Sequence, residues 1–153
     1  MKKEIKFMRA ALKEAKKAEL IDEVPIGCVI VKDDKIICRA HNMRETKQNP
    51  LGHAELLAID KASKKLKSWR LDGCELYVTL EPCIMCSGAI IQSRINKVYF
   101  GAYDPKGGAL GSSINVLEAE NINHHPEIFG GILQEECSLM LTDYFKAKRQ
   151  KKD

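Results

Sequence analysis

The second half of the chain alternates between segments with helical periodicity and short apolar segments typical of buried strands. Residues 53–66 place small and aliphatic side chains at helical spacing, and residues 74–80 form a short, mainly apolar run. A helix is expected to start at Pro82, and residues 97–102 predict a further strand. Because strands that alternate with helices pair through crossover connections, this order predicts a layered α/β fold with parallel strands.

The first part of the chain predicts a helix followed by a hairpin. Apolar side chains recur every three or four residues over residues 1–19, which indicates an amphipathic helix. Residues 28–31 and 36–38 are short apolar runs separated by an Asp-Asp turn, and they predict two antiparallel strands.

The end of the chain completes the predicted architecture. Residues 104–112 are rich in glycine and predict an irregular loop, and residues 127–133 predict a short edge strand. The last helix is expected to carry one apolar stripe, which consists of Cys137, Met140, Leu141, Tyr144 and Phe145. We therefore predict a three-layer α-β-α fold in which helices cover both faces of a mixed, roughly five-stranded sheet.

The length of 153 residues and the composition indicate one globular domain over residues 1–153. Hydrophobic residues make up 44% and charged residues 30%, as is ordinary for a globular protein. No segment approaches the roughly 18 to 20 apolar residues of a membrane-spanning helix. The basic start of the chain is not followed by the long apolar stretch of a secretory signal, so we expect a cytoplasmic protein that does not contact membranes.

The net positive charge is concentrated at the end of the chain. Residues 144–153 contain five basic residues and one acidic residue, which accounts for the whole formal charge of +4. A solvated helix end is the simpler interpretation of such a tail, and a phosphate-binding segment is the alternative.

Two cysteines and one histidine form a candidate metal site. Cys83 and Cys86 are three residues apart, so they share one face of a first helical turn, where the positive helix end favours thiolates. His53 begins another predicted helix, and two thiolates with one imidazole suit zinc. Three protein ligands leave a position for water, as in catalytic zinc sites, although His41 could supply a fourth ligand. Taken alone, the two cysteines could also form a redox dithiol.

The remaining four cysteines lie in apolar runs and are expected to pack in the core as free thiols, because disulfides are rare in the cytosol. They are Cys28, Cys38, Cys74 and Cys137.

Glu55 supplies the carboxylate that zinc-assisted hydrolysis needs as a proton acceptor. Positions two apart in a regular helix point about 200° away from each other. His53 and Glu55 can therefore share one site only where His53 stands at the very start of the helix, which Pro50 and Gly52 favour.

A His-x-Glu triplet followed by Pro-Cys-x-x-Cys resembles the signature of the cytidine deaminase superfamily. Within that superfamily, the chain resembles the bacterial tRNA-specific adenosine deaminases over nearly its whole length. The resemblance extends to residues 23–27, 40–42, 68–71, 76–83, 101–102, 104–108 and 111–112, and to Tyr144, Phe145 and Arg149. The chain differs from these enzymes at Leu51-Gly52, where they usually have Thr-Ala.

The resemblance implies a chemistry and a substrate. It implies that His53, Cys83 and Cys86 bind one zinc ion per chain, and that Glu55 shuttles protons during hydrolytic deamination of adenosine to inosine. It further implies a homodimer that acts on the wobble adenosine in the anticodon loop of an arginine tRNA.

The resemblance also implies five substrate-binding residues. Asn42 would hold the flipped nucleoside, Asp104 and Lys106 would lie near the RNA backbone, and Phe145 and Arg149 would contact the anticodon loop. Four of them have a structural alternative: an Asx turn for Asn42, a glycine-rich surface loop for Asp104 and Lys106, and core packing for Phe145. In this context, the basic tail beside Phe145 favours a nucleic-acid contact.

Two other classes of function stay open from the sequence. A deaminase of free bases or nucleosides would share the zinc chemistry without needing a basic tail. A non-catalytic, zinc-stabilised RNA-binding subunit would not need Glu55.

Overall fold

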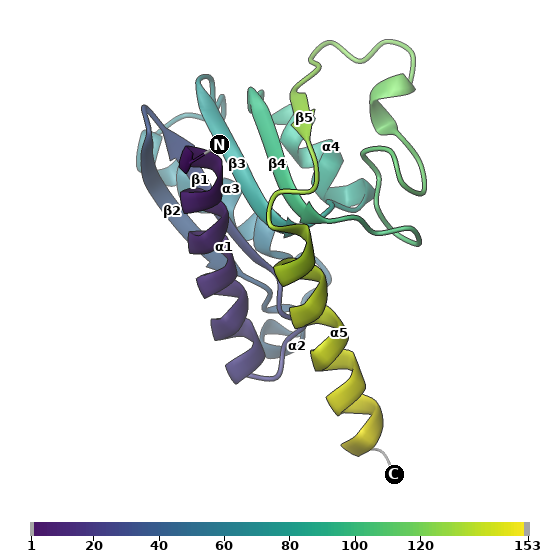
Figure 1. Ribbon diagram of the computed structural model, residues 1–153. Helices are drawn as coiled ribbons and strands as arrows, with labels where there is room; N and C mark the ends of the chain where they lie inside the picture. Colours follow the sequence, from purple (N-terminus) through teal and green to yellow (C-terminus); the bar gives the residue numbers. More distant parts are fainter. Residues whose placement is uncertain (1, 152–153) are drawn as a thin grey trace.

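The structure, a computed structural model, describes residues 2–151 and contains one mixed five-stranded sheet (Figure 1). The strands are β1 (Gly27–Lys32), β2 (Lys35–His41), β3 (Cys74–Leu80), β4 (Lys97–Ala102) and β5 (Glu127–Phe129). Their order in the sheet is β2-β1-β3-β4-β5. β1 pairs antiparallel with β2 and β3, whereas β3 pairs parallel with β4 and β4 with β5. The predicted mixed sheet is confirmed.

Helices cover both faces of this sheet, which confirms the three-layer fold. The helices are α1 (Lys2–Leu20), α2 (Arg44–Lys47), α3 (Ala54–Leu66), α4 (Ile84–Gln92) and α5 (Gln134–Lys151), with a short 3₁₀ helix, η1 (Val116–Glu118). α1 and α5 lie on one face, and α3 and α4 lie on the other (Figure 1).

Strand β1 shows how one strand contributes to two hydrophobic cores. Cys28 and Ile30 pack in the core beneath α3 and α4, whereas Val29 and Val31 pack in the core beneath α1 and α5. Successive side chains of a strand point to opposite faces, so an all-apolar strand requires cover on both sides.

The crossover connections bring several element ends to one edge of the sheet. In the crossovers from β2 to β3 and from β3 to β4, the helices α3 and α4 run back along the sheet. As a result, α3 and α4 begin near the edge at which β3 and β4 end. This carboxyl edge of parallel strands is the usual location of binding sites in α/β folds.

Three local predictions differ from the structure. Pro82 precedes the helix, because Cys83 is the N-cap residue of α4 and Ile84 is the first helical residue. Strand β5 ends at Phe129, since Gly131 adopts a φ of +86° that a strand cannot continue through. The connecting segments contain two short helices, α2 and η1, which the sequence did not predict.

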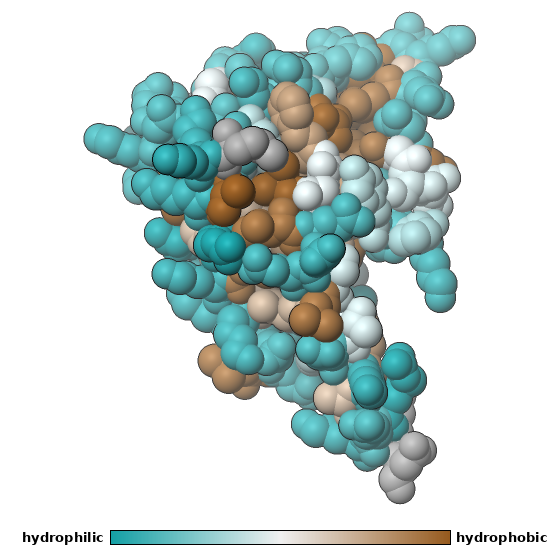
Figure 2. Space-filling model, in the orientation of Figure 1, coloured by the Kyte–Doolittle hydropathy of each residue, from teal (hydrophilic) through white to brown (hydrophobic). Residues whose placement is uncertain are grey.

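The surface is mostly polar on the side shown in Figure 2. Hydrophilic side chains cover most of α1 and of the C-terminal half of α5, as their amphipathic sequences predict (Figure 2). Within residues 2–151, no helix combines the length and the apolar character that crossing a membrane requires.

Candidate metal centre and active site

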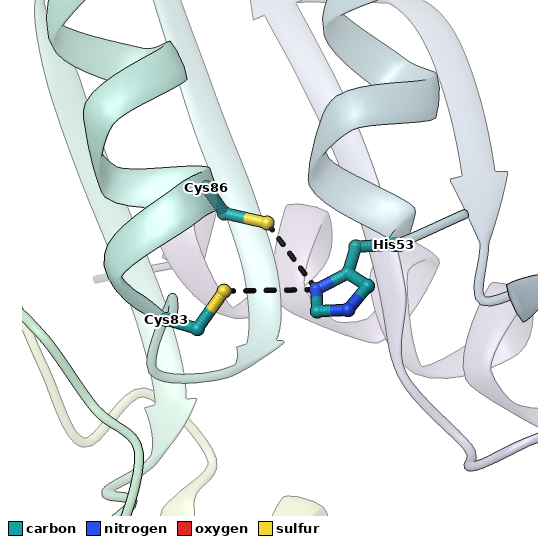
Figure 3. Close-up of side chains that lie close together, drawn as sticks. All are labelled: His53, Cys83 and Cys86. Carbon is teal, nitrogen blue, oxygen red and sulfur yellow. Dashed lines mark hydrogen bonds between the residues drawn. The ribbon is translucent and has the colours of Figure 1, made fainter. Parts of the chain in front are cut away.

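The three predicted metal ligands meet at the starts of two helices. His53 is the N-cap residue of α3, Cys83 is the N-cap residue of α4, and Cys86 lies in the first turn of α4. The Nδ1 atom of His53 lies 3.6 Å from the Sγ atom of Cys83 and 3.5 Å from that of Cys86 (Figure 3). All three donor atoms fall within 4.8 Å of one another, so one metal ion could contact them together.

Glu55 joins this cluster because His53 lies outside the helical periodicity. The backbone of His53 is extended, with φ −84° and ψ 144°, so its side chain does not follow the direction set by the helix. Glu55 lies in the first turn of α3, where it is 4% exposed, and its carboxylate is hydrogen-bonded to Cys86. The structure thus brings together the four residues that the sequence predicted for metal binding and proton transfer.

The electrostatics of the cluster suit both metal binding and proton transfer. Burial, reinforced by the neighbouring Cys83, raises the pKa of Glu55 to about 7. A hydrogen bond from Cys86, together with one from His53, lowers the pKa of Cys83 to about 4 in spite of burial. The bond to Cys83 and burial raise the pKa of Cys86, and the bond to Cys83 raises the pKa of His53. A thiolate at Cys83 is a metal ligand at neutral pH, and a carboxyl group that titrates near 7 can both accept and donate a proton.

Asn42 lies beside the cluster and supports the start of α3. It is 6% exposed, and its Oδ1 atom accepts a hydrogen bond of 3.1 Å from the backbone N–H of Ala54. This contact spans 12 residues and is not an Asx turn, so that alternative is wrong. His41 is engaged elsewhere, because its Nδ1 atom lies 3.0 Å from the Glu14 carboxylate.

The four other predicted substrate-binding residues line one groove of about 880 Å³. Asp104 and Lys106 belong to the loop after β4, whereas Phe145 and Arg149 lie on α5. The Asp104 Oδ1 atom accepts hydrogen bonds from the backbone N–H groups of Lys106 and Gly107, 3.1 Å each, which fixes the turn of this loop. Phe145 is 43% exposed, so the alternative that it packs in the core is wrong.

The basic end of α5 is partly neutralised. Lys148 forms an ion pair of 2.8 Å with Asp22, and the hydroxyl of Tyr144 donates to the same aspartate. Over residues 2–151, Lys146, Arg149 and Lys151 form no ion pair. Lys152 lies outside the described residues.

Sequence reasoning missed two buried carboxylates, which lie in the segments that lead into β1 and α4. Glu23 is 1% exposed and accepts hydrogen bonds from Glu45 and Thr46 of α2, and Glu81 is 2% exposed and contacts the loop after β4. A signal of burial was present for Glu81, which directly follows the apolar strand β3, and was weaker for Glu23, which stands four residues before β1.

Comparisons with known proteins identify the family of the chain. The model of the MafB19-like deaminase family matches residues 2–149. The chain is 56% identical over 146 residues to a tRNA-specific adenosine deaminase of Bacillus subtilis (strain 168), which covers 95% of this chain and 91% of that relative. It is 48% identical over 143 residues to a tRNA-specific adenosine deaminase of Aquifex aeolicus (strain VF5), with 94% of each chain covered.

Solved structures point to the same family. One, from a study of A-to-I editing by tRNA:A34 deaminases at the wobble position of transfer RNA, has a TM-score of 0.86 at 42% identity and covers 88% of this chain and 98% of its own. A guanine deaminase from Bacillus subtilis has a TM-score of 0.63 at 31% identity, with 95% and 92% covered. The fold is of the cytidine-deaminase type, and the similar proteins place the chain in the class of hydrolytic deaminases. Within that class, the chain belongs to the family of bacterial tRNA-specific adenosine deaminases.

Proposed function

We propose that this protein hydrolyses adenosine to inosine and ammonia at the wobble position of a tRNA anticodon loop, with one zinc ion per chain. The observation that carries the proposal is the meeting of three metal-ligand atoms with a buried carboxylate at the starts of α3 and α4. The similarity to tRNA-specific adenosine deaminases over 95% of the chain supports the choice of substrate.

The donor set fits zinc. Two thiol sulfurs and one imidazole nitrogen, close enough to share one ion, match the ligands that zinc prefers, and three protein ligands are typical of catalytic sites. His53, Cys83 and Cys86 would hold the ion, which as a Lewis acid makes water a stronger nucleophile at neutral pH.

Glu55 is the residue we propose for proton transfer. It would accept one proton from the water that attacks carbon 6 of adenine and pass it to the ring nitrogen N1. It would then accept the proton that remains on the new hydroxyl group and donate it to the amino group, which leaves as ammonia. Its buried position and its pKa of about 7 support both roles, since a group that titrates near neutral pH can act first as a base and then as an acid.

We propose that Asn42 binds the nucleoside. Its Oδ1 atom is already used by the backbone of α3, so its Nδ2 amide group is the part that can donate to the substrate. The same residue would thereby link substrate binding to the position of His53, which is next to Ala54.

The groove between the 104–107 loop and α5 is the proposed RNA contact. An exposed aromatic ring at Phe145 can stack on an unpaired base, and Lys106 and Arg149 can pair with phosphates. We extend the proposal to the arginine tRNA that the sequence resemblance implied.

Three further expectations complete the proposal. We propose that the chain acts as one domain over residues 1–153, that it forms a homodimer, and that it works in the cytoplasm, where tRNA is available. Transfer RNA is the only class of macromolecular partner that we propose besides a second copy of the chain.

The test compares substrates under identical conditions. The purified protein is incubated with the anticodon stem-loop of an arginine tRNA that carries A34, with the same stem-loop carrying G34, and with free adenosine, and inosine is measured by mass spectrometry. We expect inosine only with the first substrate. Equal or faster turnover of free adenosine would favour the small-molecule deaminase, and RNA binding without turnover would favour the non-catalytic subunit.

A further inference from the structure

Glu81 is a buried carboxylate that the proposed chemistry does not use. It lies two residues before Cys83 and accepts hydrogen bonds of 3.1 Å from the backbone N–H groups of Asp104, Leu110 and Ser112. The hydroxyl of Ser112 donates to it as well. A buried carboxylate is costly unless hydrogen bonds replace its water, so these contacts hold the loop and the carboxylate together.

The backbone beside Glu81 joins the same loop. The N–H of Glu81 donates to the carbonyl of Ala102, at the end of β4 just before the loop, and the N–H of Ala109 within the loop donates to the carbonyl of Pro82, both at 2.9 Å. At Gly108, a Cβ atom would lie only 2.4 Å from the carboxyl carbon of Glu81, so the loop passes where only glycine fits. The 104–112 loop is therefore docked directly on the segment that leads into α4.

This loop carries part of the groove. Asp104 and Lys106 line it, while Cys83 and Cys86 at the start of α4 belong to the candidate metal centre. The side-chain hydrogen bonds of Glu81 all go to the loop. Glu81 thus connects the groove to the metal centre without taking part in either.

We propose that Glu81 is a positioning residue, whose carboxylate holds the 104–112 loop at a fixed place relative to the metal centre so that Asp104 and Lys106 meet the RNA while the target base reaches Glu55. This inference rests on the proposed RNA substrate. It predicts that a change at Glu81 weakens binding of the RNA much more than it slows the chemical step.

The Glu81→Gln variant tests this directly. Each carboxylate oxygen accepts two hydrogen bonds, Oε1 from Asp104 and the Ser112 hydroxyl, and Oε2 from Leu110 and the Ser112 backbone. An amide in either orientation therefore places an NH₂ group against at least one backbone N–H group, which cannot accept a hydrogen bond. We expect faster hydrogen exchange at the amides of Asp104, Leu110 and Ser112. For the stem-loop, we expect KM to rise about tenfold while kcat changes less than about threefold.

The matched control is Glu14→Gln. Glu14 is also a buried carboxylate, 4% exposed, but it accepts hydrogen bonds from the side chains of His41 and Lys17 rather than from a loop of the groove. The Glu14→Gln variant measures the general effect of losing a buried carboxylate. We expect its KM to stay near that of the wild type. The zinc content of both variants should stay at one ion per chain.

A second pair of variants serves if Glu81→Gln does not fold. Ser112→Ala removes one donor to Glu81, and the neighbouring Ser113→Ala removes a hydroxyl that makes no hydrogen bond within residues 2–151. We expect a smaller rise in KM, about threefold, for Ser112→Ala only.

The outcomes separate the two proposals. A KM for Glu81→Gln no higher than that of Glu14→Gln, or faster exchange of the loop amides with unchanged KM, would overturn the role of Glu81 and leave the proposed function intact. A wild-type protein that does not deaminate the stem-loop would overturn the proposed function and this inference with it.

Discussion

At the scale of single residues, the site depends on where His53 and Cys83 lie. Each residue stands immediately before the first helical residue of its helix. At that position the side chain is not bound to the helical periodicity, so His53 can share a site with Glu55 two residues later. Cys83 can likewise approach Cys86 from the adjoining extended backbone. The backbone N–H groups at both helix starts add positive potential, which favours thiolates and the carboxylate.

Glu55→Gln is expected to abolish deamination without loss of metal or fold. The amide preserves the shape of a buried side chain but cannot accept the proton, and general acid–base catalysis typically contributes about 10² to 10⁴-fold. Inosine formation on the stem-loop measures the loss, and zinc analysis with a thermal melt checks the fold. Asp60→Asn is the control, because it makes the same chemical change on the exposed side of α3 and should keep full activity. Near wild-type turnover by Glu55→Gln would refute the proposed role of Glu55.

Cys86→Ala is expected to lose zinc and thermal stability together. Metal binding to a folded site contributes to folding free energy, so losing one of three ligands lowers both. Cys74→Ala is the matched control, since Cys74 is equally buried but lies outside the metal cluster, and it should retain zinc. Full zinc occupancy in Cys86→Ala, measured by atomic absorption, would refute the ligand assignment.

At the scale of elements, helix α5 both packs on the sheet and lines the groove. Its first turns pack on the sheet through Cys137, which is 1% exposed, whereas its C-terminal half contributes Phe145 and Arg149 to the groove. Asp22, in the turn after α1, holds this half through contacts with Lys148 and Tyr144. The unpaired basic side chains beyond it are then available to phosphates.

Changing Arg149, Lys151 and Lys152 together to Ala should weaken binding of the stem-loop and flatten its salt dependence. Each lost phosphate contact reduces the logarithmic salt slope by about 0.7 for a single strand. Stability should change little, because Arg149 and Lys151 are exposed.

The matched control for this triple change is on α1, where Lys2, Lys6 and Lys13 changed to Ala remove the same charge away from the groove. Affinity and salt slope, measured by fluorescence anisotropy, should be unchanged there. Equal effects of the two triple changes would mean that the tail acts only through net charge, and no effect of the first would mean that it is a solvated helix end.

The hydrogen bonds of Glu23 to α2 make the stability of the protein depend on pH. Burial opposes ionisation, but hydrogen bonds from Thr46 and Glu45 outweigh it and lower the pKa of Glu23 below the usual value of 4.5. A carboxyl group with a lowered folded pKa stabilises the protein above its unfolded pKa, and this contribution is lost as the pH falls through the folded pKa.

We therefore expect Glu23→Gln to be less stable than the wild type at neutral pH, with the difference shrinking below about pH 4.5. Urea unfolding over a pH series measures this, and comparing the two proteins at each pH cancels the titration of all other groups. A stability difference that stays constant down to low pH would contradict the prediction.

At the scale of the whole molecule, the sequence predicts the architecture and the metal cluster better than the connecting segments. Apolar runs, helical periodicity and the spacing of Cys83 and Cys86 are local patterns, and each specifies a strand, a helix or a shared face. The groove depends on how α5 meets the 104–107 loop, and the burial of Glu81 depends on a loop some 20 residues further along the chain. Such long-range contacts leave no periodic signal, so the roles of Glu23 and Glu81 emerge only from the fold.

The proposed homodimer is also tested at this scale. Leu51 and Ile84 flank His53 and Cys83, yet they are 54% and 63% exposed, and a second copy of the chain would cover such apolar side chains. We expect light scattering to give about twice the chain mass of 17.2 kDa. Ile84→Lys should shift the mass toward the monomer, whereas Leu139→Lys, at an equally exposed leucine on α5, should not. A fully active monomer would contradict the expectation.

The separation of the metal ligands along the chain has a consequence for unfolding. His53 and Cys83 are 30 residues apart, and between them lie α3 and β3. An ion held by both residues therefore works as a reversible cross-link that closes a 30-residue loop, and it lowers the chain entropy of the unfolded state as any such closure does. Removing the ion with a chelator would remove this cross-link, and we expect the protein then to be digested faster by a protease.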